Sequence, residues 1–333
     1  MDDPFARMQD LEAADREIAD LEARLREAKL HRQQKRDTMP DGFYENTSPH
    51  QQRQHFLFLL SDSALPLGSF AFSSGLESYL AHDKAAAAAA ASASLAAAAN
   101  ALPKRAKAGP DAFAEFLPLS VSSYAHASLP FVLAAHDAGM TVVKPTPTSH
   151  RSRASLDAFT TALVLLDDTY DATIICTVGR RASVAQGRAL LSIWERAFSP
   201  ALTSSAPTDP LRPFSRLVKQ SSNPPPGTLS EASAHMPPLF GAVAALSGLD
   251  RRQTADVFVL AHIKALLSAA VRANLLGPYQ AQRLLASGMA QRLATKAVED
   301  TWNVPVEEAG QTVPVVDLWM GRHEMLYSRI FNS

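Results

Sequence analysis

Residues 59–77 read Leu59-Leu60-Ser61-Asp62-Ser63-Ala64-Leu65-Pro66-Leu67-Gly68-Ser69-Phe70-Ala71-Phe72-Ser73-Ser74-Gly75-Leu76-Glu77, the first dense apolar stretch after a charged leader. Pro66 fixes its own φ, and Gly68 supplies a conformation that side chains forbid, so the two mark a tight turn. The glycine spacing matches neither a dinucleotide-binding loop nor a P-loop. The stretch therefore predicts a packing element that sets the angle between two helices.

Composition narrows the class of protein. The 333 residues are 47% hydrophobic, carry a net charge of −1 and include one cysteine, Cys176. This hydrophobic content excludes wholesale disorder, and the charge disfavours a dedicated nucleic-acid binder. A single cysteine excludes an internal disulfide, and the N-terminus lacks a basic-then-apolar signal sequence. We expect a cytoplasmic protein without a membrane span, which would bind a protein or a small molecule.

Composition also predicts the domain organisation. Residues 1–50 form a charged arm and linker, and residues 51–333 form one domain with low-complexity insertions at about 84–110 and 199–234. A short heptad seam in the leader fits either a coiled coil or an arm packed on its own domain, and its brevity favours the arm. The alanine run at 84–110 fits either a helix or a disordered segment.

Apolar residues at spacings of three and four predict an all-α fold. A helix over residues 113–138 is expected to break at Pro118 and Pro130. Residues 155–198 include a β-branched run at 173–178, but a longer apolar stripe predicts one continuous helix there. The adjacent Asp167 and Asp168 do not share a helix face, so a solvated turn is favoured over a pair of catalytic carboxylates.

Two further helices are expected near the C-terminus. Asp250 and Gln253 form a capping-box pair at the start of a helix that ends at Gly277-Pro278, and residues 279–300 form the next helix. Arg272 lies close to the apolar stripe of the first of these, which fits either a structural ion pair or an interface arginine. Histidines 126 and 136 lack partners at metal-ligand spacing.

Residues 314–333 close the chain with a distinctive tail that reads Pro314-Val-Val-Asp317-Leu-Trp-Met-Gly-Arg-His-Glu-Met-Leu-Tyr-Ser-Arg-Ile-Phe-Asn-Ser333. The tail is not a zincin motif, because Tyr327 stands where the second histidine would be needed. Its aromatic and arginine content is typical of an interface anchor. The alternative is a tail docked on its own domain, and the composition favours the interface.

Three stretches together resemble the UreF family of urease accessory proteins. They are the opening signature at residues 65–77, the segment Gln186-Gly187-Arg188-Ala189-Leu190-Leu191 with His235-x-Pro and Phe240-Gly241 after it, and the tail. Ser69 and Pro278 depart slightly from the family pattern. The residues that carry the resemblance as structural signature are Pro66, Gly68, Phe70, Gly75, Glu77, Gln186, Gly187, Arg188, Gly241 and Gly277.

The resemblance implies a function. UreF proteins are non-catalytic assembly factors that bind the UreD (or UreH) accessory protein and recruit or regulate the UreG GTPase, so that nickel reaches apo-urease. They can also form homodimers. No cofactor, resident metal, nucleic acid or membrane partner is implied. The candidate partner-binding residues are Arg272, His323, Glu324, Tyr327, Ser328, Arg329 and Phe331, and Arg272 is also a candidate to act on the GTPase in trans.

Two other classes of protein are also compatible with the sequence. One is a helical hydrolase with a dispersed Ser/His/Asp site, although no Gly-x-Ser-x-Gly elbow supports it. The other is a helical scaffold outside the urease pathway. The insertions and the charged leader indicate a eukaryotic, fungal member of the family.

Overall fold

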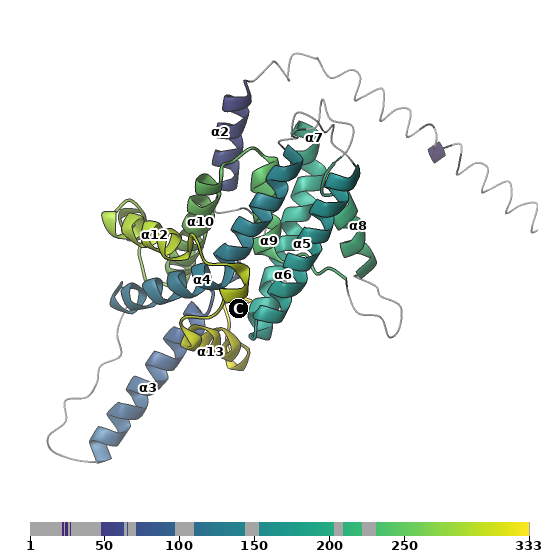
Figure 1. Ribbon diagram of the computed structural model, residues 1–333. Coiled ribbons are helices and arrows are strands. Elements are labelled where there is room, and N and C mark those ends of the chain that lie inside the picture. The colour runs from purple at the N-terminus through teal and green to yellow at the C-terminus, as the bar shows by residue number, and fades with distance from the viewer. Residues whose placement is uncertain are drawn as a thin grey trace, which may run out of the picture. The chain divides into compact units, whose positions relative to one another are not determined.

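The structure is a computed structural model that describes residues 22, 24–25, 27, 48–62, 65, 71–96, 110–143, 153–202, 209–221 and 231–332. The chain divides into two units, residues 1–52 and residues 53–333. The four described residues of the leader, from 22 to 27, are helical and exposed. Every regular element among the described residues is a helix, which confirms the predicted all-α class (Figure 1). The predicted domain boundaries stay a prediction.

Helices α2 (Pro49–Leu60) and α3 (Leu76–Ala96) flank the opening signature. Pro66, Gly68 and Phe70 of the signature lie outside the described residues. The stretch ends in two left-handed residues, Ser74 and Gly75, with φ of 51° and 87°, and α3 begins directly after them. The alanine run is helical as far as Ala96, and residues 97–109 lie outside the described part.

Helix α4 (Pro110–Val143) runs through both prolines, so the predicted breaks at Pro118 and Pro130 are wrong. A proline removes one helical hydrogen bond and leaves the carbonyl four residues earlier without its usual donor. For Pro130 that carbonyl belongs to His126, and the N–H of Gly310 donates to it at 3.3 Å. Packing of α4 against neighbouring helices along most of its length stabilises the helix despite the prolines.

Helices α5 (Arg153–Thr173) and α6 (Thr177–Ile193) replace the single helix expected over this region. Residues 174–176 interrupt the helix, with Cys176 in an extended conformation. The guanidinium of Arg180 donates to the carbonyls of Asp171 and Ile174, both at 3.0 Å, which satisfies backbone groups that the break exposes. The β-branched run thus ends a helix without forming a strand.

A π-helical turn η3 (Trp194–Phe198) and helix α7 (Ser199–Leu202) extend α6. Helix α8 (Arg212–Ser221) lies inside the stretch expected to be a low-complexity insertion. It is ordered by burial, because Leu211, Phe214 and Val218 lie at helical spacing and are at most 5% exposed. This short apolar stripe is difficult to recognise in the sequence, because polar residues and prolines surround it.

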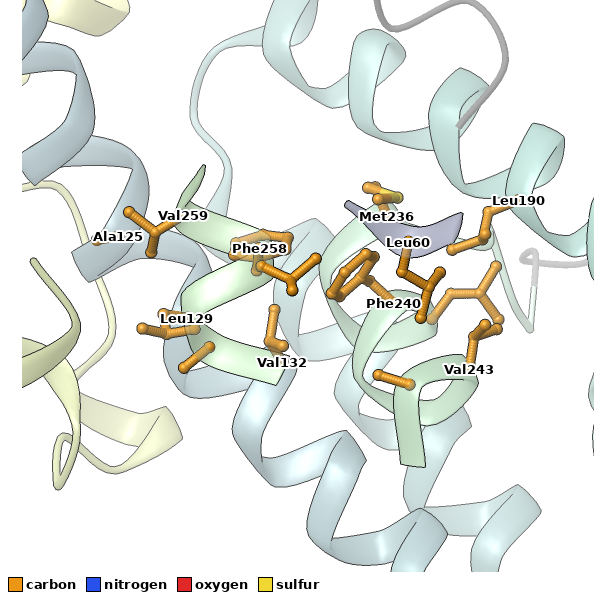
Figure 2. Packing of buried hydrophobic residues seen from close by; sticks show 14 of the residues in the cluster. Leu60, Ala125, Leu129, Val132, Leu190, Met236, Phe240, Val243, Phe258 and Val259 are labelled. Atoms are coloured by element: carbon orange, nitrogen blue, oxygen red, sulfur yellow. The ribbon is translucent and has the colours of Figure 1, made fainter. Parts of the chain in front are cut away.

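Helices α9 (Met236–Leu246) and α10 (Arg251–Arg272) form the centre of the domain with α4. Figure 2 shows Phe240 of α9 and Phe258 of α10 directed into the cluster, with Val132 of α4 beside them. The predicted cap of α10 is confirmed, because Asp250 Oδ1 accepts from the N–H of Gln253 at 2.7 Å and the Gln253 side chain accepts from Asp250 in return.

The C-terminal part consists of short helices. They are α11 (Pro278–Leu285), α12 (Gly288–Thr301), the 3₁₀ turn η4 (Val306–Glu308), α13 (Pro314–Arg322) and the 3₁₀ turn η5 (His323–Met325). The single helix expected over residues 279–300 is therefore two helices. Ser287 separates them, because its side chain caps α12 by accepting from the N–H of Ala290 at 3.4 Å.

By length and composition alone, α4 and α10 could each cross a membrane. Within the most apolar 18-residue window of each helix, 67% of α4 and 61% of α10 is buried inside the protein. Both helices supply core residues around which the other helices pack. Their apolar character is thus accounted for by helix packing.

Candidate functional site

The opening signature and the C-terminal tail come together at the start of α3. Helix α13 of the tail packs against Gly75, where an added Cβ would lie 3.2 Å from the backbone nitrogen of Met320. Trp319 of α13 packs against the rings of Tyr79 and Phe116, with centroid distances of 4.7 and 5.7 Å. The two stretches that carry the family resemblance most clearly, 253 residues apart at Glu77 and Ile330, therefore form one site.

Glu77 lies at the centre of this site. Its carboxylate accepts from Nε2–H of His323 at 2.8 Å, from the N–H of Ile330 at 2.6 Å and from the N–H of Phe331 at 3.2 Å. The side chain of Glu77 is 12% exposed, and that of His323 is fully buried. An ionised carboxylate only accepts hydrogen bonds, so the imidazole must carry its proton on Nε2.

Phe331 holds the end of the tail. It is 4% exposed, and the guanidinium of Arg272 lies 4.4 Å from its ring centroid, a cation–π contact. The next residue, Asn332, donates its N–H to the carbonyl of Ala71 at 2.7 Å. Burial lowers the pKa of the Arg272 guanidinium. Arg272, His323 and Phe331 thus dock the tail on its own domain.

Other tail residues face solvent. Met325 is 79% exposed and Tyr327 is fully exposed, and Ile330 is 61% exposed. Arg322, Ser328 and Arg329 are exposed as well, while Glu324 pairs with Arg181 of α6. Large apolar side chains that stand in solvent beside arginines have the composition of an interface. Partner binding by any of these residues stays a prediction.

A second constellation joins α5, α6 and the chain that enters α9. Asp167 is 1% exposed, and its carboxylate accepts from the N–H groups of Ser233, Ala234 and His235 at 2.6, 3.0 and 2.5 Å. The expectation that Asp167 lies in a solvated turn is therefore wrong. Asp167 continues the spacing of Phe159 and Leu163 on the buried face of α5, and this was the signal that sequence reasoning missed.

Two signature glycines, Gly187 and Gly241, allow close packing of the backbone. Gly187 faces the chain before α9, where an added Cβ would lie 1.9 Å from the carbonyl oxygen of Ala234. Gly241 allows α9 to cross α4, since a Cβ there would lie 2.0 Å from the carbonyl oxygen of Val132. Arg188 donates to the carbonyl of Ser233 at 3.2 Å, and Gly277 stands at the N-cap of α11. At Gly187 the chain before α9 therefore lies directly against the backbone of α6.

The same region brings a serine, a histidine and an aspartate together. His235 is fully buried, with Nδ1 3.1 Å from Ser183 Oγ and Nε2 2.9 Å from Asp171 Oδ1. Ser183 Oγ also accepts from the N–H of Met236 at 3.2 Å, so this oxygen helps to hold the start of α9. Ser183 lies inside α6, where the backbone amides bond within the helix and cannot stabilise an oxyanion. The arrangement suits a structural network better than a hydrolase.

A pocket of about 140 Å³ lies between α4, α5, α6, α9, α10 and α13. Desolvation lowers the pKa of His262, on its wall, to about 3, and desolvation raises the pKa of Tyr170 to about 12. Desolvation also raises the pKa of Asp317, which accepts from the Gln311 amide at 2.6 Å. In the part of the chain that the structure describes, no three histidine, cysteine or acidic side chains gather closely enough to hold a metal ion.

Comparison with known proteins identifies the family. The family model of UreF matches residues 107–288. A protein of Schizosaccharomyces pombe named "Uncharacterized urease accessory protein UreF-like" is 31% identical, over 85% of this chain and 98% of the relative. The chain therefore belongs to the UreF family of urease accessory proteins.

Similar proteins occur in other fungi and in plants. "Urease accessory protein 6" of Cryptococcus neoformans var. grubii is 27% identical over 86% of this chain and 99% of its own length. "Urease accessory protein F" of Oryza sativa subsp. indica is 28% identical over 86% of this chain and 89% of its own length. The fungal similarity agrees with the expectation raised by the leader and the insertions.

Proposed function

We propose that this protein is a non-catalytic assembly factor for urease. In this proposal it binds a UreD- or UreH-type accessory protein and recruits or regulates a UreG-type GTPase, so that nickel is inserted into apo-urease. It does so in the cytoplasm, as a monomer or a homodimer. The single cysteine of the chain is compatible with a reducing compartment.

The observation that carries the proposal is the two-sided character of the tail. His323 and Phe331 are buried and hold the tail in place, while Met325 and Tyr327 stand in solvent on the same short segment. Exposed apolar side chains that gather on one segment and are rimmed by polar residues mark interaction sites. The exposed Arg322 and Arg329 beside them favour a partner whose rim carries carboxylates.

Binding to the accessory proteins tests this proposal. The full chain is co-expressed with the UreD-type and UreG-type proteins of its source, and complexes are measured by size-exclusion chromatography with light scattering. We expect a stable complex with the UreD-type protein that recruits the UreG-type protein. The double variant Tyr327→Ala, Arg329→Ala should weaken this complex at least tenfold, because it removes an aromatic anchor and a rim charge.

Tyr279→Ala is the matched control. Tyr279 is 91% exposed on α11, away from the tail in sequence, and its loss should leave the complex unchanged. Point variants are preferable to a chain ending at Val313, because Trp319 and Phe331 belong to the packed domain. A folded wild-type chain that binds neither accessory protein would favour the alternative of a helical scaffold outside the urease pathway.

The role of Arg272 on the GTPase stays a prediction. In the structure its guanidinium lies on the ring of Phe331, and its Nε–H donates to the carbonyl of Ser268 at 3.5 Å. An arginine that acts in trans would have to leave Phe331 first. This placement supports an indirect effect of Arg272, through the order of the tail, over direct contact with a nucleotide.

A further inference from the structure

The tail loop, residues 323–331, is closed at both ends by one side chain. Glu77 accepts from His323 where the loop begins and from the N–H groups of Ile330 and Phe331 where it ends. We name this group, the Glu77 carboxylate with its three donors, the tail clasp. The clasp lies in the first turn of α3, where a negative charge is also favoured by the helix dipole.

The residues between the two ends contribute little to holding the loop. Met325, Tyr327, Ser328 and Arg329 are exposed, and Leu326 is only half-buried. The ion pair of Glu324 with Arg181 is exposed to solvent, and exposed ion pairs contribute little stability. A segment with so few buried contacts opens readily unless its ends are fixed. Hydrogen bonds to an ionised carboxylate are stronger than those between neutral groups. Glu77 therefore contributes much of the free energy that keeps the loop ordered.

Neutral replacement would leave at least one donor of the clasp without an acceptor. A glutamine has one acceptor oxygen, and its amide nitrogen is itself a donor. The carboxylate meets its three donors with both oxygens: Oε1 accepts from Ile330, and Oε2 accepts from His323 and Phe331. In Glu77→Gln the amide nitrogen would take the place of one carboxylate oxygen and would face a donor in place of an acceptor. The loop would be released at the donor or donors on that side.

An ordered loop binds a partner with less loss of conformational entropy than a mobile one. We therefore propose that Glu77 is a positioning residue for partner binding, which holds the loop so that Met325, Tyr327 and Ile330 are presented together. The inference rests on the proposed function, because it takes the tail as the docking element. Glu77 of the opening signature would thus affect partner binding indirectly, by ordering the tail loop.

Hydrogen exchange in the free full-length chain tests the clasp directly. In Glu77→Gln, the backbone amides of Ile330 and Phe331 should exchange at least tenfold faster than in the wild type, with helical content unchanged. Affinity for the UreD-type protein should fall at least tenfold. Glu299→Gln, the same change at an exposed site on α12, is the control and should alter neither quantity.

A second variant guards against misfolding of the first. Ile330→Pro removes the N–H that donates to Glu77 at 2.6 Å and lies in an exposed loop, so the helical core is untouched. It should also speed exchange of the Phe331 amide at least tenfold. Wild-type exchange at residue 331 in both variants would overturn the clasp.

The two proposals fail differently. Fast exchange with unchanged affinity for the UreD-type protein would overturn the positioning role and leave the clasp as a structural feature. A wild-type chain that binds no accessory protein would overturn the proposed function, while the exchange result in the free chain would still decide whether Glu77 orders the loop.

Discussion

At the scale of single residues, buried polar side chains position backbone. Asp167 binds three consecutive amides at the entrance to α9, and one of them belongs to Ala234, whose φ is 65°. A left-handed alanine is strained, so hydrogen bonds to its amide and to its neighbours help to stabilise the turn. Glu77 does the same for the tail. In both cases a carboxylate that is largely shielded from solvent holds backbone N–H groups in place.

His262 predicts a dependence of stability on pH. Burial lowers the pKa of His262 to about 3 in the folded protein, below 6.5 for an ordinary histidine. The contribution to the free energy of unfolding is therefore full above pH 6.5 and is lost as the pH falls from 6.5 towards 3, by about 1.4 kcal/mol per pH unit. Urea unfolding between pH 6.5 and 4.5 measures this slope, and His262→Gln should reduce it. An equal slope in both proteins would contradict the burial of a neutral imidazole.

At the scale of helices, close crossings decide which positions must lack a side chain. Gly187 and Gly241 lie where a Cβ would meet backbone atoms within 2.0 Å. Backbone on both sides cannot move as a flexible side chain can, so these two crossings fix how α6 and α4 pack against α9 and the chain that enters it.

Gly187→Ala should destabilise the protein by about 2 kcal/mol or more. Overpacking costs about 1–3 kcal/mol and occasionally more. A contact of 1.9 Å with backbone puts the cost at or above the upper end of this range, so the gain of about 1 kcal/mol in helix propensity still leaves a net loss of about 2 kcal/mol or more. Gly288→Ala is the control, because a Cβ there would meet only the flexible end of Arg292, at 3.0 Å. Thermal and urea unfolding of the two variants provide the comparison. Equal stability for Gly187→Ala and the wild type would mean that α6 and the chain before α9 are not in contact as described.

The helices themselves could largely be predicted from the sequence, while their ends could not. Apolar periodicity located the segments around α4, α5, α6 and α10, and the Asp250 cap was correct. The continuity of α4 at Pro130 and the break at Ile174 could not be predicted, because they depend on hydrogen bonds from the N–H of Gly310 and from the guanidinium of Arg180. Such a donor is invisible in a local pattern.

The candidate site could also be predicted only in part from the sequence. Family resemblance selected Glu77, His323 and Phe331, but spacing in sequence could not reveal that they meet. It also could not separate the buried anchors from the exposed Tyr327, since aromatic residues suit both roles. Only the three-dimensional contacts divide the tail into a part that holds it and a part that faces solvent.

At the scale of the whole molecule, α4, α9 and α10 make a closely packed helical centre, and the tail lies over the start of α3 (Figure 1). The described helices hold polar networks at His235 and Glu77 that organise backbone. This division between a packed centre and an exposed, clasped loop suits a protein that works by binding other proteins. We propose that such binding serves urease maturation.

Urease activation with and without this chain tests that proposal. Urease subunits are co-expressed in nickel-containing medium with the UreD-type and UreG-type proteins of the same source, with and without this chain, and urease activity is measured per amount of urease protein. We predict at least a tenfold rise in activity when the chain is present and little rise with the Tyr327→Ala, Arg329→Ala variant. Equal activity with and without a folded chain would contradict the assignment to urease assembly.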